Sequence, residues 1–324
     1  KTDVLTIKED EEKYYDAVVK EGEIFKNEVE ILKKCQEDAI KNNILYYLYD
    51  TCGSSNESRN SYRGQLLTEY CLHGDIEKYK EEYKEKYIEE YKEKWLEDNQ
   101  PRKHFAKLIL DICTAICYLH KNKIYHCDIK PANIMVTERN GTITAILGDF
   151  GLATKEDDPC QENGTQLYQN AILQQIPPKV AVGAADGTKA ATAAVVDEKH
   201  SDIITCPDLM RKRDYYAFGI SILSIFFDVE KKDLVQFKKE EQFIFEGKAS
   251  ENFLLEFLEK QRIPEDTKFI TKEGLKSLLI PTTETTGDEL LSFKEETTGD
   301  ELLSFKEKLA QSLNDPIAPA FTEV

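Results

Sequence analysis

The segment Ile124–Val136, IYHCDIKPANIMV, most constrains what this chain can fold into. An acid, Asp128, a lysine, Lys130, and an amide, Asn133, stand at fixed spacing between residues that favour β-strands. The tetrapeptide GDFG begins at Gly148, fifteen residues after Asn133. We expect these polar groups to act together at one site.

The residue types of this set suit phosphoryl transfer. That reaction needs a carboxylate to orient the attacking hydroxyl and accept its proton, oxygen atoms to hold Mg²⁺, and a cation to shield the moving phosphate. Asp128 can be the carboxylate, Lys130 the cation, and Asn133 and Asp149 the metal ligands. Oxygen ligands suit a hard cation that keeps several waters and bridges nucleotide phosphates. The predicted cofactors are therefore ATP and Mg²⁺.

Composition limits the classes of partner and the location that we expect for this chain. The 324 residues carry a net charge of -18, which would repel nucleic acid and favours a basic protein substrate. The longest strongly apolar stretch, Ala217–Phe227, is shorter than the ~20 residues of a membrane span. The eight cysteines form no CxxC pair, so we expect reduced thiols and a cytoplasmic protein.

Strand and helix signals change along the chain. Asp3–Ile7 alternates like a strand, and the apolar residues of Glu21–Ile40 recur at helical spacing. Two strand-like runs follow, Ile44–Asp50 and Gln65–Leu72, separated by a polar loop. Later residues are mostly helical in pattern, as in the expected buried helix Phe105–Lys121. A small mixed lobe joined to a larger helical lobe is predicted.

A long charged helix is expected over residues 76–98. Its aromatic residues recur every four positions and form a stripe, which consists of Tyr79, Tyr83, Tyr87, Tyr91 and Trp95. The stripe either rests on the body of the lobe or forms a docking surface for a partner helix.

Two later segments have simple or repeated sequence. Residues 172–200 hold a low-complexity insert that we expect to be a flexible loop. The dodecapeptide ETTGDELLSFKE occurs twice in tandem, over Glu284–Glu295 and Glu296–Glu307, and is predicted to lengthen a terminal helix.

The run HCDIKPAN followed by DFG resembles the catalytic and metal-binding loops of eukaryotic protein kinases. The resemblance implies an α+β, two-lobed fold, with a partial N-lobe of small mixed β-sheet in residues 1–71 and a mostly helical C-lobe in residues 72–324. It implies transfer of the ATP γ-phosphate to serine or threonine, because tyrosine kinases replace Lys130. The alternative is a pseudokinase that acts as a nucleotide-binding or scaffolding module.

The resemblance extends upstream to an ion pair. NEVEIL resembles the helix whose glutamate, here Glu28, pairs with a strand lysine. AVVK, ending at Lys20, is the closer match to the family's lysine motif. Lys20, however, lies only eight residues before Glu28, which leaves no room for a strand end, a loop and two helical turns. LTIK, ending at Lys8, leaves twenty residues, and we therefore expect Lys8 to be the partner of Glu28.

LLTEYCLHGDI resembles the family's fifth strand and hinge. The resemblance implies that Thr68 is the gatekeeper and that backbone groups of Glu69 and Cys71 bond the adenine. It implies that Asp75 reaches the ribose, although Asp75 could instead cap the helix that begins at Ile76. Met135 is also implied to be a nucleotide-binding residue.

RDYYAFGISIL resembles a buried helix of the family. The resemblance implies that Asp214 braces the catalytic loop near His126. It also implies that His126 and Phe150 pack in a stack with Leu32, so His126 is not expected to act as an acid or base.

Several features depart from the family pattern. The glycine-rich loop has no counterpart before Lys8, so we expect a kinase domain whose first two strands are missing or lie upstream of Lys1. The substrate-docking loop is either residues 164–171, GTQLYQNA, or residues 200–208 after the insert. The closing segment lacks the arginine that usually pairs with a glutamate near the docking loop, so the C-lobe is expected to be held differently.

Cys127 occupies the position of an arginine that, in most of the family, binds a phosphate on the activation segment. A cysteine offers neither the permanent charge nor the reach of arginine. Cys127 is either an inert buried thiol or a redox-sensing one. In both cases we expect activity that does not depend on phosphorylation between Asp149 and Asp208.

Overall fold

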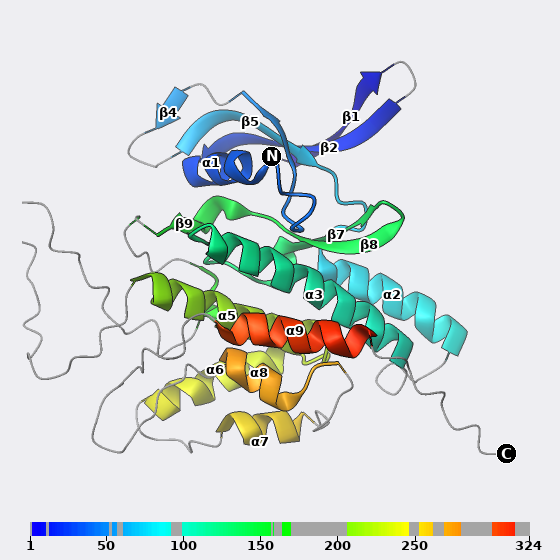
Figure 1. Cartoon of the computed structure of the whole chain (residues 1–324), viewed down its shortest axis with the longest axis vertical. Coiled ribbons are helices and arrows are strands. Elements are labelled where there is room, and N and C mark those ends of the chain that lie inside the picture. Colours follow the sequence, from blue (N-terminus) through cyan, green and yellow to red (C-terminus); the bar gives the residue numbers. More distant parts are fainter. Residues whose placement is uncertain are drawn as a thin grey trace, which may run out of the picture.

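The computed structural model describes residues 2–10, 13–51, 54–56, 61–91, 99–156, 158, 164–169, 206–245, 253–261, 269–279 and 300–314. A small lobe made of a sheet and one helix lies above a larger lobe made mostly of helices (Figure 1). The predicted α+β, two-lobed architecture is confirmed.

The small lobe is an antiparallel sheet with one helix against it. Its elements are β1 (Thr2–Asp10), β2 (Lys13–Phe25), α1 (Lys26–Cys35), β3 (Tyr47–Asp50), β4 (Ser54–Asn56) and β5 (Ser61–Glu69). The strand order is β1-β2-β5-β3, and β4 pairs with β5. The prediction of a polar loop before residue 65 is therefore wrong in part, because this stretch contains β4 and the start of β5.

Strand β2 runs directly into helix α1. Ile24 and Phe25, which the helical spacing had assigned to the helix, pair with Tyr62 and Ser61 of β5 instead. The helix begins at Lys26, and its buried face includes Val29 and Leu32 as predicted. The absence of a connecting loop here changes which lysine can reach Glu28.

Short elements between α3 (Asn99–Lys121) and α5 (Cys206–Ile225) in the chain carry or flank the candidate functional residues. They are β6 (Ile124–Tyr125), the 3-10 turn η2 (Pro131–Asn133), β7 (Ile134–Arg139), β8 (Thr142–Leu147), the 3-10 turn η3 (Phe150–Leu152), β9 (Thr154–Lys155) and the 3-10 turn η4 (Gln166–Tyr168). The β7–β8 hairpin closes through Asn140 and Gly141, with φ of 52° and 71°. Asn-Gly is the pair that best tolerates two positive φ angles in a tight hairpin.

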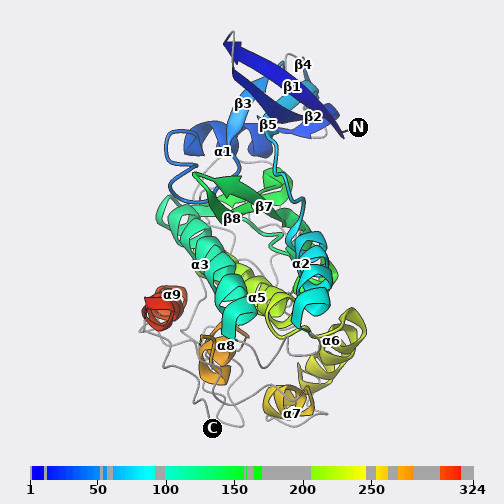
Figure 2. The same cartoon turned by 90° about the vertical axis from the view of Figure 1, so that its right-hand side faces the viewer.

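The described helices of the large lobe are α2 (Ile76–Tyr91), α3 (Asn99–Lys121), α5 (Cys206–Ile225), α6 (Lys231–Phe245), α7 (Phe253–Lys260), α8 (Lys272–Leu279) and α9 (Asp300–Asn314). In Figure 2, α3 and α2 descend below the β7–β8 hairpin with α5 between and beneath them. Helix α3 is buried as predicted, with Leu108, Ile112 and Ile116 at most 1% exposed. No helix in the described part of the chain is both long and apolar enough to cross a membrane.

The aromatic stripe of α2 begins against α3. Tyr79 is 8% exposed, and its hydroxyl lies 2.8 Å from Nε2 of His104. The ring of Tyr83 stacks on His104 at 4.8 Å between centroids. These two residues therefore rest on the body of the lobe, while the side chains from Tyr87 to Trp95 lie outside the described set.

Parts of two other predictions lie outside the described residues. These are the low-complexity insert at 172–200 and the first copy of the repeat, Glu284–Glu295. The second copy, from Asp300 onwards, forms the first part of α9, where Leu302 and Phe305 are buried.

Candidate active site

Asp214 of α5 holds the loop that carries Asp128. Its Oδ2 accepts a hydrogen bond from the backbone N–H of His126 at 2.9 Å, and its Oδ1 accepts one from the N–H of Cys127 at 2.8 Å. Asp214 is 1% exposed, and Nε2 of His120 lies 2.8 Å from its Oδ2. The predicted bracing of this loop by Asp214 is confirmed.

Two non-glycine residues of the site have left-handed backbones. Cys127 has φ of 63° and Asp149 has φ of 58°. Such conformations cost free energy and persist where surrounding contacts impose them. The bond from Cys127 N–H to Asp214 is one such contact, and the buried ring of Phe150, 5.1 Å from the His126 ring, anchors the residue after Asp149.

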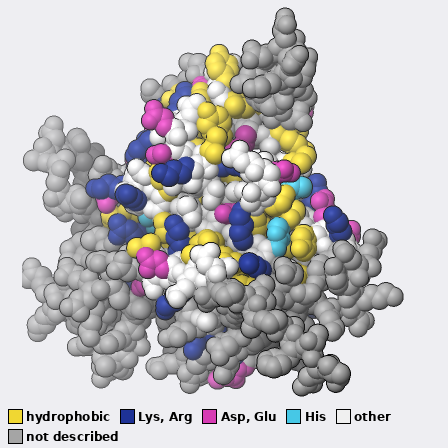
Figure 3. Space-filling model, turned by 45° about the vertical axis from the view of Figure 1, so that its right-hand side comes forward, with side chains coloured by type: hydrophobic (Ala, Val, Ile, Leu, Met, Phe, Trp, Pro, Cys, Tyr) yellow, Lys and Arg dark blue, Asp and Glu magenta, His cyan; other side chains and the backbone are white. Residues whose placement is uncertain are grey.

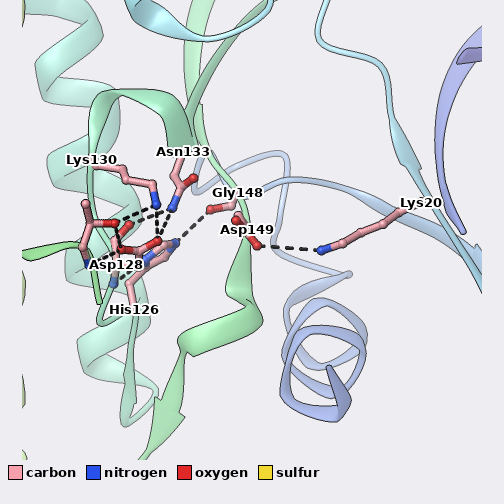
Figure 4. A network of polar contacts seen from close by, with 8 residues as sticks. Lys20, His126, Asp128, Lys130, Asn133, Gly148 and Asp149 are labelled. Carbon is pink, nitrogen blue, oxygen red and sulfur yellow. Dashed lines mark hydrogen bonds and ion pairs between the residues drawn. The ribbon is translucent and has the colours of Figure 1, made fainter. Parts of the chain in front are cut away.

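Asp128 lies at the centre of a hydrogen-bond network (Figure 4). Lys130 Nζ donates to its Oδ2 at 2.6 Å, and Asn133 Nδ2 donates to the same atom at 3.0 Å. The Thr165 hydroxyl and backbone N–H lie 2.8 and 2.9 Å from its Oδ1. Burial acts to raise the pKa of Asp128, but the bonds from Lys130 and Thr165 and the charge of Lys130 outweigh it and hold this pKa below its ordinary value. The carboxylate is therefore ionised at neutral pH and able to accept a proton.

Asn133 and Asp149 are brought together by backbone pairing. The N–H of Gly148 donates to the Asn133 carbonyl at 3.0 Å, so Asp149 follows immediately after a residue tied to Asn133. The Nδ2 of Asn133 is used on Asp128, which leaves the amide Oδ1 as the atom suited to a cation. The Asp149 side chain is 51% exposed. One carboxylate and one amide oxygen fit the oxygen coordination that Mg²⁺ prefers.

The lysine that pairs with Glu28 is Lys20, and the prediction of Lys8 is wrong. Lys20 Nζ lies 2.9 and 2.7 Å from Oε1 and Oε2 of Glu28 and 3.9 Å from Oδ1 of Asp149. Lys8 lies on β1, where its backbone pairs with Tyr14. The distance argument failed because β2 enters α1 without a loop and Glu28 lies in the first helical turn. Burial raises the pKa of Glu28, and the charge and hydrogen bond of Lys20 offset part of this rise.

The residues expected to bind the nucleotide base form the end of β5 and the segment after it. Thr68 is 7% exposed and lies opposite Val18 of β2. Cys71 is buried, and burial, with a smaller effect from the charge of Glu69, raises the pKa of its thiol to about 12. The sulfur is thus a neutral group, and the predicted adenine contacts of this segment involve its backbone.

Asp75 and Met135 meet where this segment touches β7. The two residues form an isolated bridge, and Met135 pairs with Ile146 of β8. Asp75 Oδ1 accepts a hydrogen bond from the N–H of Lys78 at 2.9 Å. Asp75 therefore caps α2, as the alternative interpretation had it, and its contact with a ribose stays a prediction.

The segment 164–169 lies against the catalytic loop. The Thr165 hydroxyl is bonded to both Asp128 and Lys130, the latter at 2.9 Å. Gly164 has φ of 131°, and a Cβ there would lie 2.6 Å from the Cys127 carbonyl oxygen, so only glycine fits. At the other end, Lys238 Nζ of α6 contacts the Gln169 carbonyl oxygen and lies 3.2 Å from the Tyr216 hydroxyl.

This geometry favours residues 164–171 over residues 200–208 as the docking loop. Cys206–Asp208 forms the first turn of α5 instead. Lys238 ties the end of the segment to α6 and α5.

The Cys127 thiol is half-buried and contacts two neighbouring residues. Its Sγ lies 3.7 Å from Sδ of Met210 and 3.5 Å from the Tyr125 carbonyl oxygen. Burial, aided by the charge of Asp214 and opposed by that of Arg213, raises the pKa of the thiol well above its ordinary range. A thiol that stays neutral is a poor nucleophile, so the raised pKa and the contact with Met210 favour the inert interpretation over redox sensing.

Charges of both signs are mixed on the face drawn in Figure 3. Lys and Arg side chains spread across its middle, with Asp and Glu side chains among them. The net charge of -18 is therefore not gathered on this face, and a preference for basic substrates stays a prediction.

Sequence reasoning missed Lys20 and left Thr165 without a role on Asp128. The signal for Lys20 was the match of AVVK to the family's lysine motif, which a spacing argument overruled. The role of Thr165 had no local signal, because it lies 37 residues from Asp128.

Comparison with known proteins finds similarity over the part of the chain that holds this site. A family model described as the protein kinase domain covers residues 3–171, just over half of the chain. The chain is 29% identical over 165 residues to the negative regulator of sexual conjugation and meiosis of Schizosaccharomyces pombe, which covers 49% of this chain and 30% of that protein.

Two further relatives are named as kinases. Identity is 30% over 149 residues with serine/threonine-protein kinase pakG of Dictyostelium discoideum, covering 46% of this chain and 10% of that protein. Identity is 32% over 126 residues with serine/threonine-protein kinase TOS3 of Saccharomyces cerevisiae, covering 39% of this chain and 19% of that protein. The matched part spans less than a third of each of these three relatives.

Proposed function

Since this chain belongs to the protein kinase family, we propose that it transfers the γ-phosphate of ATP to serine or threonine hydroxyls of protein substrates. The observation that carries the proposal is the Asp128 carboxylate, hydrogen-bonded by both Lys130 and Thr165. The first is the lysine that the resemblance associates with serine/threonine transfer. The second comes from the segment that resembles a substrate-docking loop.

In the proposed reaction, Asp128 orients the attacking hydroxyl and accepts its proton. The hydroxyl oxygen forms a bond to the γ-phosphorus as the bond from that phosphorus to the β-phosphate oxygen breaks, and ADP leaves. Lys130 stands 2.6 Å from Oδ2 of Asp128, close enough to shield negative charge on the phosphate in transit. The depressed pKa of Asp128 keeps its carboxylate free to accept the proton.

The phosphates would be held from both sides of the site. Lys20, fixed by Glu28, faces Asp149 at 3.9 Å and would bind the phosphates nearest the small lobe. Asn133 and Asp149 would hold Mg²⁺, which when bound neutralises charge on the β- and γ-phosphates. Thr68, Glu69 and Cys71 would line the adenine site.

The proposal extends to substrates and setting. A basic protein substrate would suit the net charge of -18, and a cytoplasmic location would suit the reduced cysteines. The structure describes the side chains of five cysteines, and each is a free thiol: Cys35, Cys71, Cys113, Cys117 and Cys127.

The test combines binding and transfer. Mg-ATP should raise the melting temperature of the protein by mass action, and Asp149→Ala should remove the part of the shift that depends on Mg²⁺. Asp128→Asn should keep nucleotide binding but lower transfer to casein-like or basic substrates by orders of magnitude, because an amide cannot take the proton.

The outcomes separate the two candidate functions. A thermal shift with phosphate on serine or threonine supports the kinase. A shift without transfer to any substrate supports the alternative, a pseudokinase that acts as a nucleotide-binding or scaffolding module. No shift with or without Mg²⁺ rejects nucleotide binding, and phosphotyrosine as the main product rejects the serine/threonine assignment.

A further inference from the structure

Arg139, at the end of β7, joins three separate segments. Its two terminal nitrogens donate to backbone carbonyls after α1, to Ile40 at 3.2 Å and to Ile44 at 3.1 Å. The second nitrogen also forms a close ion pair with Oε1 of Glu69, the last residue of β5. The Arg139 side chain is 11% exposed and that of Glu69 is 20% exposed, so water screens this pair only in part.

Glu69 is fixed by its backbone as well as by its side chain. Its Oε1 accepts a hydrogen bond from the N–H of Tyr46 at 2.6 Å, and its own N–H donates to the Tyr46 carbonyl at 3.0 Å. The residue therefore makes a closed pair of bonds with Tyr46, and Arg139 neutralises the carboxylate. Glu69 has little freedom to rotate out of this position.

The same contacts reach the catalytic residues. The segment that Arg139 binds pairs with the end of β8, because the Leu45 N–H donates to the Leu147 carbonyl at 3.0 Å and the Leu147 N–H donates to the Asn43 carbonyl at 2.9 Å. Leu147 stands two residues before Asp149. Arg139, Glu69 and the backbone groups that they bind are called the Arg139 cluster. The cluster thus connects the end of β5 to the hairpin that precedes Asp149.

We propose that Arg139 and the Glu69 side chain are positioning residues for the nucleotide, which hold the backbone of residues 69–71 in the conformation that receives the adenine. The inference rests on the proposed function, since it concerns the same nucleotide site. A segment that is already ordered in the free protein loses less conformational entropy when the ligand binds. Without the cluster, this ordering would be lost on binding, and the affinity would fall.

The expected effect is on affinity rather than on the chemical step. Arg139→Met removes the cation and both carbonyl contacts, and we expect the Kd for Mg-ATP to rise roughly tenfold. Glu69→Gln keeps an oxygen for the Tyr46 N–H but removes the charge that meets Arg139, so a smaller rise is expected. Arg139→Lys should recover only part of the affinity, because one ammonium group cannot replace a planar fork at three acceptors.

Lys107→Met is the matched control. Lys107 Nζ also joins a carboxylate to a backbone carbonyl, with Asp111 Oδ2 at 2.7 Å and the Ile143 oxygen at 2.6 Å. It fastens the same β7–β8 hairpin to α3, but these two bonds, to Asp111 and Ile143, involve neither Glu69 nor Tyr46. Its loss should lower stability without raising the Kd for Mg-ATP.

The experiment titrates each protein with a fluorescent ATP analogue and displaces the analogue with Mg-ATP, which gives the Kd for Mg-ATP. The temperature is kept well below the melting temperature of the wild type and of each variant. The kcat and the KM for ATP are measured on the same proteins. The expected result is a higher Kd and KM for Arg139→Met and Glu69→Gln at similar kcat. Unchanged Kd in both variants would overturn the inference, and so would an equal rise in Lys107→Met. If Arg139→Met does not fold, Glu69→Gln decides.

The two proposals fail in different ways. A wild-type protein that binds no nucleotide overturns both. A wild-type protein that binds Mg-ATP but transfers no phosphate overturns the kinase proposal alone, because the Kd still tests the role of Arg139 and Glu69.

Discussion

Replacing Lys20 by methionine removes the cation that meets Glu28. In the native protein both carboxylate oxygens of Glu28 lie within 2.9 Å of Lys20 Nζ, and Glu28 is 4% exposed. Methionine keeps most of the volume of the lysine stem but offers no donor. The substitution therefore leaves a buried carboxylate without the ion pair that offsets its burial.

The magnitude follows from how deeply each partner is buried. Breaking a fully buried ion pair costs roughly 3–5 kcal/mol. The Lys20 side chain is 36% exposed, so solvent weakens the pair, and we expect a loss of about 2 kcal/mol in the free energy of unfolding. For a chain of 324 residues, with an unfolding entropy of about 2.1 cal/mol/K per residue, that corresponds to a fall of roughly 3 °C in melting temperature.

The loss should depend on pH in a defined direction. Burial already raises the pKa of Glu28 above its ordinary value of 4.5, and Lys20 opposes that rise. Without Lys20 the folded-state pKa rises further, so the folded variant binds a proton that the unfolded chain releases. Stability is then greatest below about pH 4.5 and falls as pH rises through the folded-state pKa. The gap between wild type and variant should be small near pH 4 and full at neutral pH.

The assay is thermal unfolding of wild type, Lys20→Met and Lys8→Met between about pH 4 and pH 8. Lys8→Met should stay within about 0.5 kcal/mol of wild type, because it leaves the ion pair between Lys20 and Glu28 intact. A pH-independent loss in Lys20→Met would refute the argument from Glu28. A loss confined to Lys8→Met would restore the interpretation based on sequence spacing.

Two further predictions concern the catalytic loop. Thr165→Val removes the hydroxyl between Asp128 and Lys130, and we expect kcat to fall at least about tenfold with the Kd for Mg-ATP unchanged, as the loss of one bond in a catalytic network implies; equal kcat would remove Thr165 from the site. Complete dephosphorylation, confirmed by mass spectrometry, should leave the transfer rate within about twofold of its starting value, because Cys127 cannot bind a phosphate as arginine does; a tenfold fall that rephosphorylation restores would show that another cation, such as Arg213, takes that role.

The error over Lys20 shows where local patterns lose their meaning. Ile24 and Phe25 fit the apolar spacing of the helix that follows, so the helix was expected to begin near Glu21. The backbone of this stretch instead pairs with Ser61 and Tyr62, almost forty residues later in the chain. Pairing with a distant strand overrides a helical spacing of apolar residues, and no window of neighbouring residues reveals it.

The arrangement of the proposed catalytic residues could be predicted for the opposite reason. Asp128, Lys130 and Asn133 lie within one short loop, and the pairing of β7 with β8 brings Asp149 back to Asn133. Spacing along the chain therefore nearly determines their spacing in the structure. The sequence left two candidate segments for the docking loop, because the contact that distinguishes them, between Thr165 and Asp128, forms across 37 residues.

Cys127 shows which part of a residue this position requires. Its backbone N–H donates to Asp214, its backbone has a positive φ, and its carbonyl oxygen limits residue 164 to glycine. Each of these contacts uses atoms that every residue except proline supplies. The side chain is half-buried against Met210. Bracing of the catalytic loop therefore places no demand on the side chain, and an arginine can be exchanged for a cysteine here without loss of the hydrogen bonds that hold Asp128 in place.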